Sequence, residues 1–484
     1  MSTVPFDSSL VFVDGHWRPC ASGRTLPLVD PSDGSPLALI ARGQADDIDA
    51  AVRAAEQALA GTWGALSAAE RGRILMAMSR CVLQQADELA RLEALDVGKP
   101  LKQGRADALA LARYLEFYGG AADKVMGQTI PFANGYTALT WREPHGVTAH
   151  IVPWNYPMQI IGRSVGAALA MGNACVLKPA EEACLTALAF ARIAAEAGLP
   201  PGALNVVPGL GEEAGAALAA HPGVRHVSFT GSVAVGRLIQ AAAARHAVPV
   251  TLELGGKSPQ IVFADADLDT ALPFLVNAGI QNAGQTCSAA SRILVERPVF
   301  DTVVARMADR YRSLRIGRAL DDLDVGPLIS QRQRDIVQGY LDLVREGGLH
   351  VAAQASLPAD LPAGGFYVCP TLVADVRPQH PIAQEEVFGP VQAVIPFDGE
   401  DEAVRVANGT PYGLVAGVWT RDGARQLRMA RRLQCGQVFV NNYGAGGGIE
   451  LPFGGVKLSG HGREKGFEAL AGFSTLKTVA IKHD

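Results

Sequence analysis

Two side chains in the second half of the chain could carry out covalent chemistry together. Cys287 lies in a polar, glycine-containing stretch, residues 281–288, and Glu253 follows the apolar run 248–252 and precedes two glycines. A cysteine is a nucleophile only as its thiolate, and a carboxylate held nearby can move protons. An acid between two leucines also invites burial, which raises the pKa of a carboxyl group. The pair therefore predicts covalent catalysis through a cysteine, with a glutamate acting in a second step.

The chain contains seven cysteines, and a free cysteine most often behaves as a small buried hydrophobe. Six are expected to do so, whereas polar neighbours set Cys287 apart. The odd number, the irregular spacing and the lack of a Cys-x-x-Cys pair predict neither a disulfide framework nor a zinc site, and we expect no metal. Free thiols favour a reducing, cytoplasmic setting. For Glu253 the alternative interpretation is a carboxylate on the surface.

The bulk composition is that of a globular protein with several domains. The chain has 484 residues, of which 48% are hydrophobic and 19% are charged, and its net charge is −5. At roughly 150 residues per domain, this length predicts about three domains. The small negative charge gives no reason to expect a nucleic acid or an anionic membrane as partner. We also expect neither a signal peptide nor a membrane span, since no run of about 20 apolar residues occurs.

The elements that must position the two residues follow an alternating pattern. Residues 44–120 carry alanine, leucine and valine at helical spacing and predict helices. From residue 145 onward, short apolar runs alternate with helical segments, as in βαβ units around a parallel sheet. The expected strands are residues 148–152, 174–177, 204–207, 226–229, 248–252, 260–263, 292–296, 391–397, 437–441 and 474–482. The expected helices are residues 157–171, 183–198, 211–220, 267–278 and 300–314.

Residues 153–157, with the sequence Pro-Trp-Asn-Tyr-Pro, follow a predicted strand and precede a predicted helix. The two prolines fix the backbone and would present the Asn155 amide at the C-terminal end of the strand, where ligands bind in open α/β sheets. A rigidly held amide N–H is suited to stabilising an oxyanion. The alternative is an asparagine that caps the helix, and the segment alone does not decide between the two.

Two further strand ends carry residues suited to a nucleotide. The sequence Ser-Phe-Thr-Gly-Ser-Val-Ala-Val-Gly contains Gly231, Ser232 and Gly236, and a helix N-terminus there would favour a phosphate. Lys178 and Glu181 end another predicted strand and could bind ribose hydroxyls. Each pattern has a plain structural alternative, which is a glycine turn before a helix in the first case and solvated surface charges in the second.

Together these motifs resemble the aldehyde dehydrogenase superfamily, and the resemblance covers nearly the whole chain. The motifs PWNYP, LKPAE, FTGSVAVG, LELGGKSP, GQTCSA, EEVFGP and PFGGVK occur in the order of that family. The interval of 34 residues from Glu253 to Cys287 also matches. The resemblance implies an α/β fold with a Rossmann-type cofactor domain, an α/β catalytic domain and a β hairpin for oligomerisation. The cofactor domain is implied at residues 1–122 and 145–252, and the catalytic domain at residues 253–452. The oligomerisation segment is implied at residues 123–144 and 465–484.

The resemblance implies that the protein oxidises an aldehyde to its acid. Cys287 is implied as the nucleophile, Asn155 and the backbone N–H of Cys287 as the oxyanion hole, and Glu253 as the base that activates water. Glu464 matches a second acid that some members use in proton relay. An aldehyde releases hydride readily only from a tetrahedral adduct. Thiolate attack, hydride transfer and hydrolysis of a thioester would therefore follow in that order.

The same resemblance implies NAD as the cofactor, because Glu181 would repel the 2′-phosphate of NADP. Exposed hairpin strands need partners, so a homodimer or a homotetramer is expected. The other partner is a small-molecule aldehyde. The implied cofactor-binding residues are Ile151, Pro153, Trp154, Lys178, Glu181, Gly231, Ser232, Gly236, Leu254, Glu386 and Phe388.

Arg163 bears on the choice of aldehyde. It lies eight residues after Asn155, about two turns along a helix, and arginine binds carboxylates bidentately. It predicts a preference for acidic semialdehydes or hydroxylated aromatic aldehydes, with a structural ion pair as the alternative. The glycine run in residues 443–450 suggests a roomier cavity mouth, although an inward Glu450 would disfavour an anion. The remaining implied substrate residues are Tyr156, Thr286, Ser288 and Phe453.

Three other functions compete with this reading. A CoA-acylating dehydrogenase would share the thioester but would not need Glu253 for hydrolysis. A cysteine hydrolase would need a histidine partner, and none of the ten histidines lies in a recognisable setting. A non-catalytic binding protein of the same fold would lack the nucleophile, whereas Cys287 is present.

Overall fold

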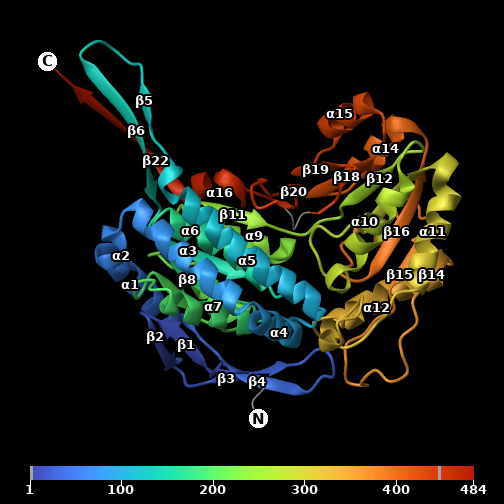
Figure 1. Ribbon diagram of the computed structural model, residues 1–484, viewed down its shortest axis with the longest axis horizontal. Coiled ribbons are helices and arrows are strands. Elements are labelled where there is room, and N and C mark those ends of the chain that lie inside the picture. The colour runs from blue at the N-terminus through green and yellow to red at the C-terminus, as the bar shows by residue number, and fades with distance from the viewer. Residues whose placement is uncertain (1–3, 445–447, 484) are drawn as a thin grey trace.

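The computed structural model describes residues 4–444 and 448–483, which form two α/β bodies side by side and a β hairpin that projects from the first (Figure 1). Each body has its own hydrophobic core. The first core is drawn from residues up to Leu254 together with Ile449, Ala469, Leu470 and Phe473. The second core is drawn from residues between Ile261 and Phe453.

The first body is built on an eight-stranded sheet in the order β2-β1-β9-β8-β7-β10-β11-β21. Its five inner strands run parallel, and the outer strands pair antiparallel. Strands β7, β8 and β10 are buried along their whole length, which suits apolar strands between helical layers. The strands are β1 (Leu10–Val13), β2 (His16–Pro19), β7 (Val147–Val152), β8 (Ala174–Pro179), β9 (Leu204–Val206), β10 (His226–Thr230), β11 (Val250–Glu253) and β21 (Gly460–His461). A separate pair, β3 (Thr25–Val29) and β4 (Pro36–Ala41), lies near the N-terminus.

Helices of the first body pack around this sheet (Figure 1). They are α1 (Ala45–Ala60), α2 (Thr62–Ala65), α3 (Ala68–Gln84), α4 (Ala86–Val97), α5 (Leu101–Ala121), α6 (Pro157–Ala170), α7 (Leu185–Glu196), α8 (Ala216–Ala219), α9 (Val233–Ala244) and α16 (Gly466–Gly472). Helix α6 starts directly after β7, with Pro157 at its first position, where the missing N–H has no cost.

The second body contains a seven-stranded sheet in the order β14-β15-β16-β13-β12-β18-β19, parallel except for β14. Its strands are β12 (Pro259–Val262), β13 (Arg292–Glu296), β14 (His350–Gln354), β15 (Thr371–Ala374), β16 (Val391–Phe397), β18 (Val415–Trp419) and β19 (Gln437–Val440). Its helices are α10 (Leu268–Ile280), α11 (Phe300–Arg312), α12 (Gln331–Glu346), α13 (Pro381–Gln384), α14 (Gly399–Asn408) and α15 (Gly423–Arg432). The short strands β17 (Tyr412–Gly413) and β20 (Val456–Lys457) pair with each other.

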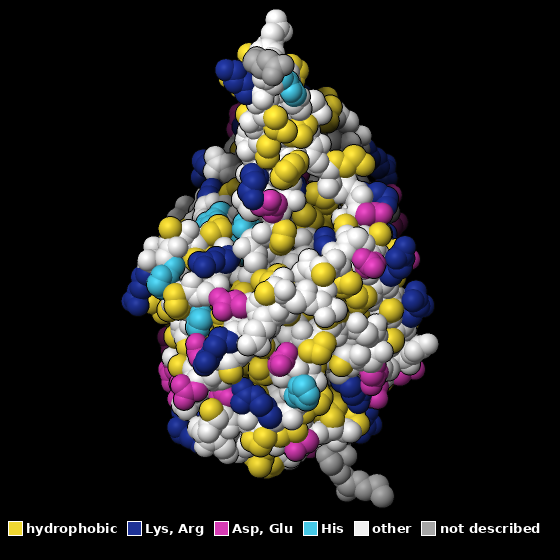
Figure 2. All heavy atoms as spheres, turned by 90° about the vertical axis from the view of Figure 1, so that its left-hand side faces the viewer, with side chains coloured by type: hydrophobic (Ala, Val, Ile, Leu, Met, Phe, Trp, Pro, Cys, Tyr) yellow, Lys and Arg dark blue, Asp and Glu magenta, His cyan; other side chains and the backbone are white. Residues whose placement is uncertain are grey.

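The projecting sheet consists of β5 (Gln128–Ile130), β6 (Tyr136–Pro144) and β22 (Ser474–Lys482). β22 pairs with β6 over nine residues, so the end of the chain is held against the hairpin. Hydrophobic side chains are spread along this arm (Figure 2), among them Phe132, Trp141 and Leu476, which are exposed in the single chain.

The predicted α/β class is confirmed, and β13, β16 and β22 begin and end where the sequence predicts. Residues 211–220 are not one helix but a π-helical turn followed by the four-residue α8. The predicted oligomerisation segment begins at residue 465, yet α16 packs in the first core through Ala469 and Leu470, and the projecting sheet resumes only at Ser474. None of the helices in the described ranges has both the length and the apolar composition needed to cross a membrane.

A buried ionic cluster joins the helical layer to α6. The Lys99 Nζ lies 2.6 Å from Glu93 Oε1 and 2.5 Å from Asp107 Oδ2, and all three side chains are buried. The same Nζ lies 4.1 Å from the centroid of the Tyr156 ring, and Gln159 donates a hydrogen bond to Asp107. Since Tyr156 and Gln159 stand at the start of α6, the cluster fixes this helix against α4 and α5.

Replacing Lys99 with methionine should destabilise the fold strongly. Two carboxylates would be left buried without their cation, a change that typically costs about 3–5 kcal/mol. We expect a clear fall in the midpoint of thermal unfolding, with partial recovery in Lys99→Met/Glu93→Gln, which removes one carboxylate as well. Lys102→Met, at an exposed position on α5, is the control, and an equal midpoint for Lys99→Met and Lys102→Met would contradict the role of the cluster.

Candidate active site

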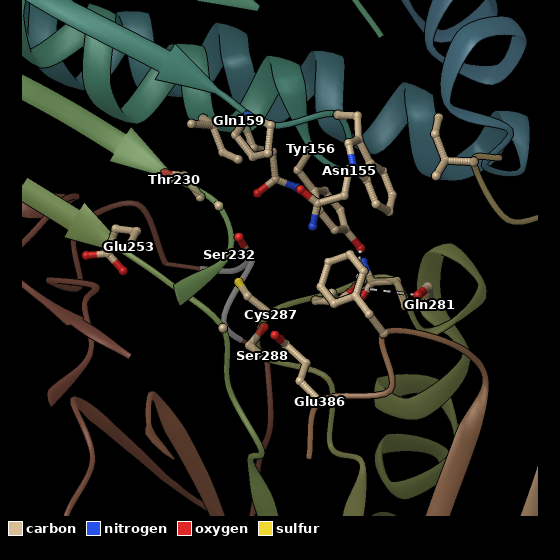
Figure 3. A pocket seen from close by; sticks show the side chains of 18 of the residues that line it. Asn155, Tyr156, Gln159, Thr230, Ser232, Glu253, Gln281, Cys287, Ser288 and Glu386 are labelled. Carbon is tan, nitrogen blue, oxygen red and sulfur yellow. Dashed lines mark hydrogen bonds between the residues drawn. The ribbon is translucent and has the colours of Figure 1, made fainter. Parts of the chain in front are cut away.

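A cavity of about 470 Å³ lies between the two bodies, at the C-terminal ends of β7, β10 and β11. It brings together fourteen of the residues that the sequence singles out. They are Pro153, Trp154, Asn155, Tyr156, Arg163, Gly231, Ser232, Glu253, Thr286, Cys287, Ser288, Glu386, Phe388 and Phe453. Figure 3 shows the cavity from close by, with Cys287 near its centre and with Asn155 and Glu386 on different sides of it.

The loop before Cys287 is held in an unusual backbone conformation. Asn282 and Ala283 both have positive φ, at 48° and 52°, a region that side chains other than glycine adopt rarely. The Gln285 side chain secures this loop by donating to Asn282 O at 3.0 Å and accepting from Ile329 N at 2.9 Å. Strain of this kind persists where the surroundings enforce it, and here it fixes the backbone just ahead of the cysteine.

The Cys287 thiol is half-buried at the cavity wall. Burial raises the pKa of this thiol to about 11, an effect that the positive charge of Arg163 opposes. The group is therefore a thiol at neutral pH, and a base must remove its proton before it can attack an electrophile.

Asn155 and the cysteine loop are joined by reciprocal hydrogen bonds. Asn155 Nδ2 donates to Gln285 O at 3.0 Å, and Asn282 Nδ2 donates to Asn155 O at the same distance. The helix-capping alternative does not hold, because Tyr156 occupies the cap position of α6 and no side chain caps that helix end. The amide is instead directed into the cavity near Cys287 (Figure 3), where an oxyanion donor would be needed.

Glu253 is buried at the end of β11, so the surface-carboxylate alternative is wrong. Neither of its carboxylate oxygens has a hydrogen-bond partner among the described residues. Burial, and next the charge of Glu464, raise the pKa of Glu253 well above its usual value. The backbone of Gly454 passes so close that a Cβ there would lie 2.7 Å from Glu253 Oε1. A buried carboxyl group with a raised pKa is suited to proton transfer near neutral pH.

Arg163 lines the cavity, and the structural ion pair considered for it is present. Its guanidinium pairs with the Glu464 carboxylate, donates to Thr230 Oγ1 at 3.3 Å and lies 4.9 Å from the Phe453 ring centroid. Glu464 does not line the cavity and lies fully buried, with Oε1 accepting from Ser228 Oγ at 3.0 Å. Its predicted part in proton relay stays a prediction; its side chain contacts both Arg163 and Ser228.

Glu450 does not face the cavity. It is exposed and pairs with Arg113 on α5, so it does not oppose an anion at the Arg163 end. Ala445, Gly446 and Gly447, on which the expected wider mouth depends, lie outside the described residues.

The other end of the cavity has the features that a dinucleotide would require. Gly231 and Ser232 stand where β10 meets the N-terminus of α9, and first-turn N–H groups of a helix attract a phosphate. Glu386 accepts from Gly256 N at 3.0 Å, and burial raises its pKa to about 7. A Cβ at Gly255 would lie 2.1 Å from Glu386 Oε2, so only glycine leaves room for this carboxylate.

Five predicted cofactor residues do not line the cavity itself: Ile151, Lys178, Glu181, Gly236 and Leu254. Lys178, one residue before the end of β8, pairs with Ile151 on β7, and its Nζ lies 2.9 Å from Glu181 Oε2. Gly236 packs against Leu254, whose Cδ2 would lie 2.6 Å from an added Cβ. Gly236 and Leu254 therefore hold α9 in place by packing. Lys178 and Glu181 form an ion pair at the C-terminal end of β8.

The sequence reasoning missed Gln159, Gln285 and Lys465. Gln159 and Lys465 line the cavity, and Gln285 holds the cysteine loop. Their sequence positions could have indicated two of them, because Gln285 lies two residues before Cys287 and Lys465 directly follows Glu464. The described residues contain no group of three His, Cys, Asp or Glu side chains that could hold a metal ion.

Comparison with known proteins decides the family. The family model "Aldehyde dehydrogenase family" matches residues 17–479. The chain belongs to the aldehyde dehydrogenase family. Hydroxyisobutyraldehyde dehydrogenase from Mycolicibacterium austroafricanum is 42% identical to it over 473 residues, which are 98% of this chain and 93% of that one.

Solved structures agree with this assignment. A crystal structure assigned to the aldehyde dehydrogenases, from Burkholderia cenocepacia, is 65% identical with a TM-score of 0.97, covering 98% of this aldehyde dehydrogenase chain and all of that one. The NAD⁺ complex of the Bacillus cereus aldehyde dehydrogenase is 38% identical with a TM-score of 0.96, covering 99% and 97%. The family membership and the fold that the motifs predict are thereby confirmed.

Proposed function

We propose that this aldehyde dehydrogenase oxidises an aldehyde to the carboxylic acid with NAD, through a thiohemiacetal and a thioester on Cys287. The observation that carries the proposal is that Cys287, the Asn155 amide and the buried Glu253 line one cavity with the N-terminus of α9. Covalent chemistry and a cofactor site therefore share one space.

The steps follow from these residues. The Cys287 thiol gives its proton to solvent water, and the resulting thiolate sulfur attacks the carbonyl carbon, which gives a tetrahedral oxyanion. The Asn155 amide and the backbone N–H of Cys287 stabilise that oxyanion. Bound NAD supplies the acceptor for the hydride that leaves the same carbon. Glu253 then takes a proton from water, the water oxygen attacks the thioester, and the acid departs with the thiol restored.

The choice of NAD rests on the residues that would hold it. Ser232 and the first turn of α9 would bind the pyrophosphate, and Glu386 would accept from the nicotinamide ribose. Trp154 and Phe388, whose ring centroids lie 5.4 Å apart, would flank that part of the cavity. Glu181 would repel a 2′-phosphate. Related structures were determined with NAD⁺, including that of the Bacillus cereus enzyme.

The substrate preference that we propose is an aldehyde carrying an acidic or a hydroxyl group. Arg163 lines the cavity, and a relative of this chain is named for a hydroxylated aldehyde, hydroxyisobutyraldehyde. The decisive experiment follows NADH absorbance over a panel of neutral, hydroxylated and acidic aldehydes, with NAD and NADP in turn. Failure of every aldehyde to yield NADH would overturn the proposed function.

Asn155→Ala should lower kcat by about 10²–10³, the usual effect of losing one oxyanion donor. The fold should survive, because within the described residues the side-chain amide makes one hydrogen bond, to Gln285 O. We would measure kcat by steady-state NADH formation and the fold by circular dichroism. Full turnover in a folded Asn155→Ala variant would remove this residue from the oxyanion hole.

We also propose that the projecting sheet forms a subunit interface in a homodimer or homotetramer of a cytoplasmic enzyme. Phe132, at 70% exposed, and Leu476, at 56%, would be covered by a second copy. Leu476→Asp should lower the mass measured by light scattering, whereas Leu320→Asp, far along the chain and also exposed, should leave it unchanged. A monomeric wild-type protein would contradict this proposal.

A further inference from the structure

Lys465 is a buried lysine in the wall of the cavity, which its position in the sequence does not predict. Only 1% of the residue is exposed, although lysine is among the residues least often fully buried. It lines the cavity together with Arg163 and Phe453. Its backbone has φ of 63°, a conformation that a side chain other than glycine adopts rarely. A strained, buried lysine directed at a reaction cavity points to a function there.

The Lys465 ammonium approaches an aromatic ring that also contacts Arg163. Its Nζ lies 5.2 Å from the Phe453 ring centroid, and the Arg163 guanidinium carbon lies 4.9 Å from the same centroid. The negative face of an aromatic ring attracts both cations. Two positive groups and an apolar ring are thus gathered at one part of the cavity wall.

The charged groups with the largest effects on the pKa of Lys465 are Arg163, Cys287, Glu464 and Glu253. Glu464 pairs with Arg163, and burial raises the pKa of Glu253 well above its usual value. Burial lowers the pKa of Lys465 to about 7. A bound anion beside the amine would raise the pKa of Lys465, and the protonated amine would in turn bind the anion more tightly.

We propose that Lys465 is a specificity residue that binds a carboxylate at the far end of the substrate. The enzyme then acts on aldehydes that carry an acid group, with the carbon chain against Phe453 and Arg163 adding to the positive field. The Arg163 guanidinium, which pairs with Glu464, lies at the same part of the cavity wall. This inference rests on the proposed aldehyde oxidation and names the substrate class for it.

The test compares succinic semialdehyde with butanal in the wild type, Lys465→Met, Lys465→Arg and the surface control Lys102→Met. The readout is the ratio of kcat/KM for the acid to kcat/KM for the neutral aldehyde, because damage to the catalytic groups affects both substrates. Lys465→Met should lower this ratio by about 10- to 100-fold, the usual range for one charge-assisted hydrogen bond, mainly through KM of the acid. Lys465→Arg should keep most of the ratio, and Lys102→Met all of it.

The pH dependence gives a second readout. A lysine with a pKa of about 7 is charged below that pH, so the acid-to-neutral ratio of the wild type should fall as pH rises from about 6 to about 9. Glu253 and Cys287 act on both aldehydes, and their titration cancels in the ratio. Equal losses for both aldehydes in Lys465→Met, or a ratio that does not change with pH, would overturn the proposal.

Calorimetric binding of succinate separates this inference from the proposed function. The wild type should bind succinate more tightly at about pH 6 than at about pH 9, and Lys465→Met should lose this difference. If no aldehyde gives NADH but succinate binding still depends on Lys465, the proposed function fails and the carboxylate site stands. If NADH forms but succinate binding is the same in the wild type and Lys465→Met, the carboxylate site fails alone.

Discussion

Cys287→Ala should abolish NADH formation from every aldehyde. Without the sulfur no thiohemiacetal forms, and hydride loss from the free aldehyde is far slower. Removal of a covalent nucleophile lowers kcat by about 10⁵–10⁶ in well-studied enzymes, and we expect a loss of that order. The measurement is steady-state NADH absorbance at saturating aldehyde, together with an NAD titration followed by intrinsic fluorescence, which should show that the variant still binds cofactor.

The matched control for this variant is Cys81→Ala. Cys81 is a free, half-buried cysteine on α3, remote in sequence from the cavity and absent from its lining. Its replacement should leave kcat within about twofold, since substitutions away from functional features have small effects. Turnover by Cys287→Ala above about 1% of wild type would assign the chemistry to another residue.

Glu253→Gln should separate the two halves of the reaction. Glutamine keeps the shape of the buried side chain but cannot take a proton from water, so the thioester should form and then persist. We expect a burst of NADH equal to about one per site, followed by steady turnover lowered by about 10²–10⁴, the usual contribution of a general base. Rapid-mixing absorbance measures the burst, and mass spectrometry should find the acyl group on Cys287.

The pH profile of the wild type belongs to the same prediction. The base acts when deprotonated, and the pKa of Glu253 is raised well above its usual value. When hydrolysis limits turnover, kcat should therefore rise with pH, and this rise should occur at a higher pH than the usual carboxyl range. The kcat of Glu253→Gln should not show this rise. If added CoA restores full turnover to the variant with acyl-CoA as product, the CoA-acylating alternative is correct. If the variant folds and shows no burst, Glu253 acts in the attack by Cys287.

Local sequence patterns predict some parts of this molecule well and others poorly. The burial of Glu253 follows from its position between Leu252 and Leu254, and the largely buried β13 and β16 have well-defined ends. By contrast, β2 is almost wholly exposed and has no apolar run to reveal it. Prediction from periodicity therefore needs an apolar run or an alternation in the sequence, which β22 has and the four residues of β2 lack.

The electrostatics of the site were the least predictable part. The pairing of Arg163 with Glu464 depends on a chain segment that returns from the C-terminal region to the first body. Lys465 likewise approaches the ring of Phe453, which lies twelve residues earlier in the chain and lines the same cavity. Motifs identified which residues react, whereas the charges that surround them are set by contacts distant in sequence.

The antiparallel strand β21 has a consequence for the synthesis of the chain. Residues 460–461 complete the edge of the first sheet by pairing with Leu252 and Glu253 on β11. A ribosome must therefore finish almost the entire polypeptide before the edge beside Glu253 is closed. Until then β11 offers an unpaired edge, the feature through which nascent chains associate wrongly. Production at low temperature or with chaperones should raise the soluble yield, and chains truncated before Gly460 should aggregate.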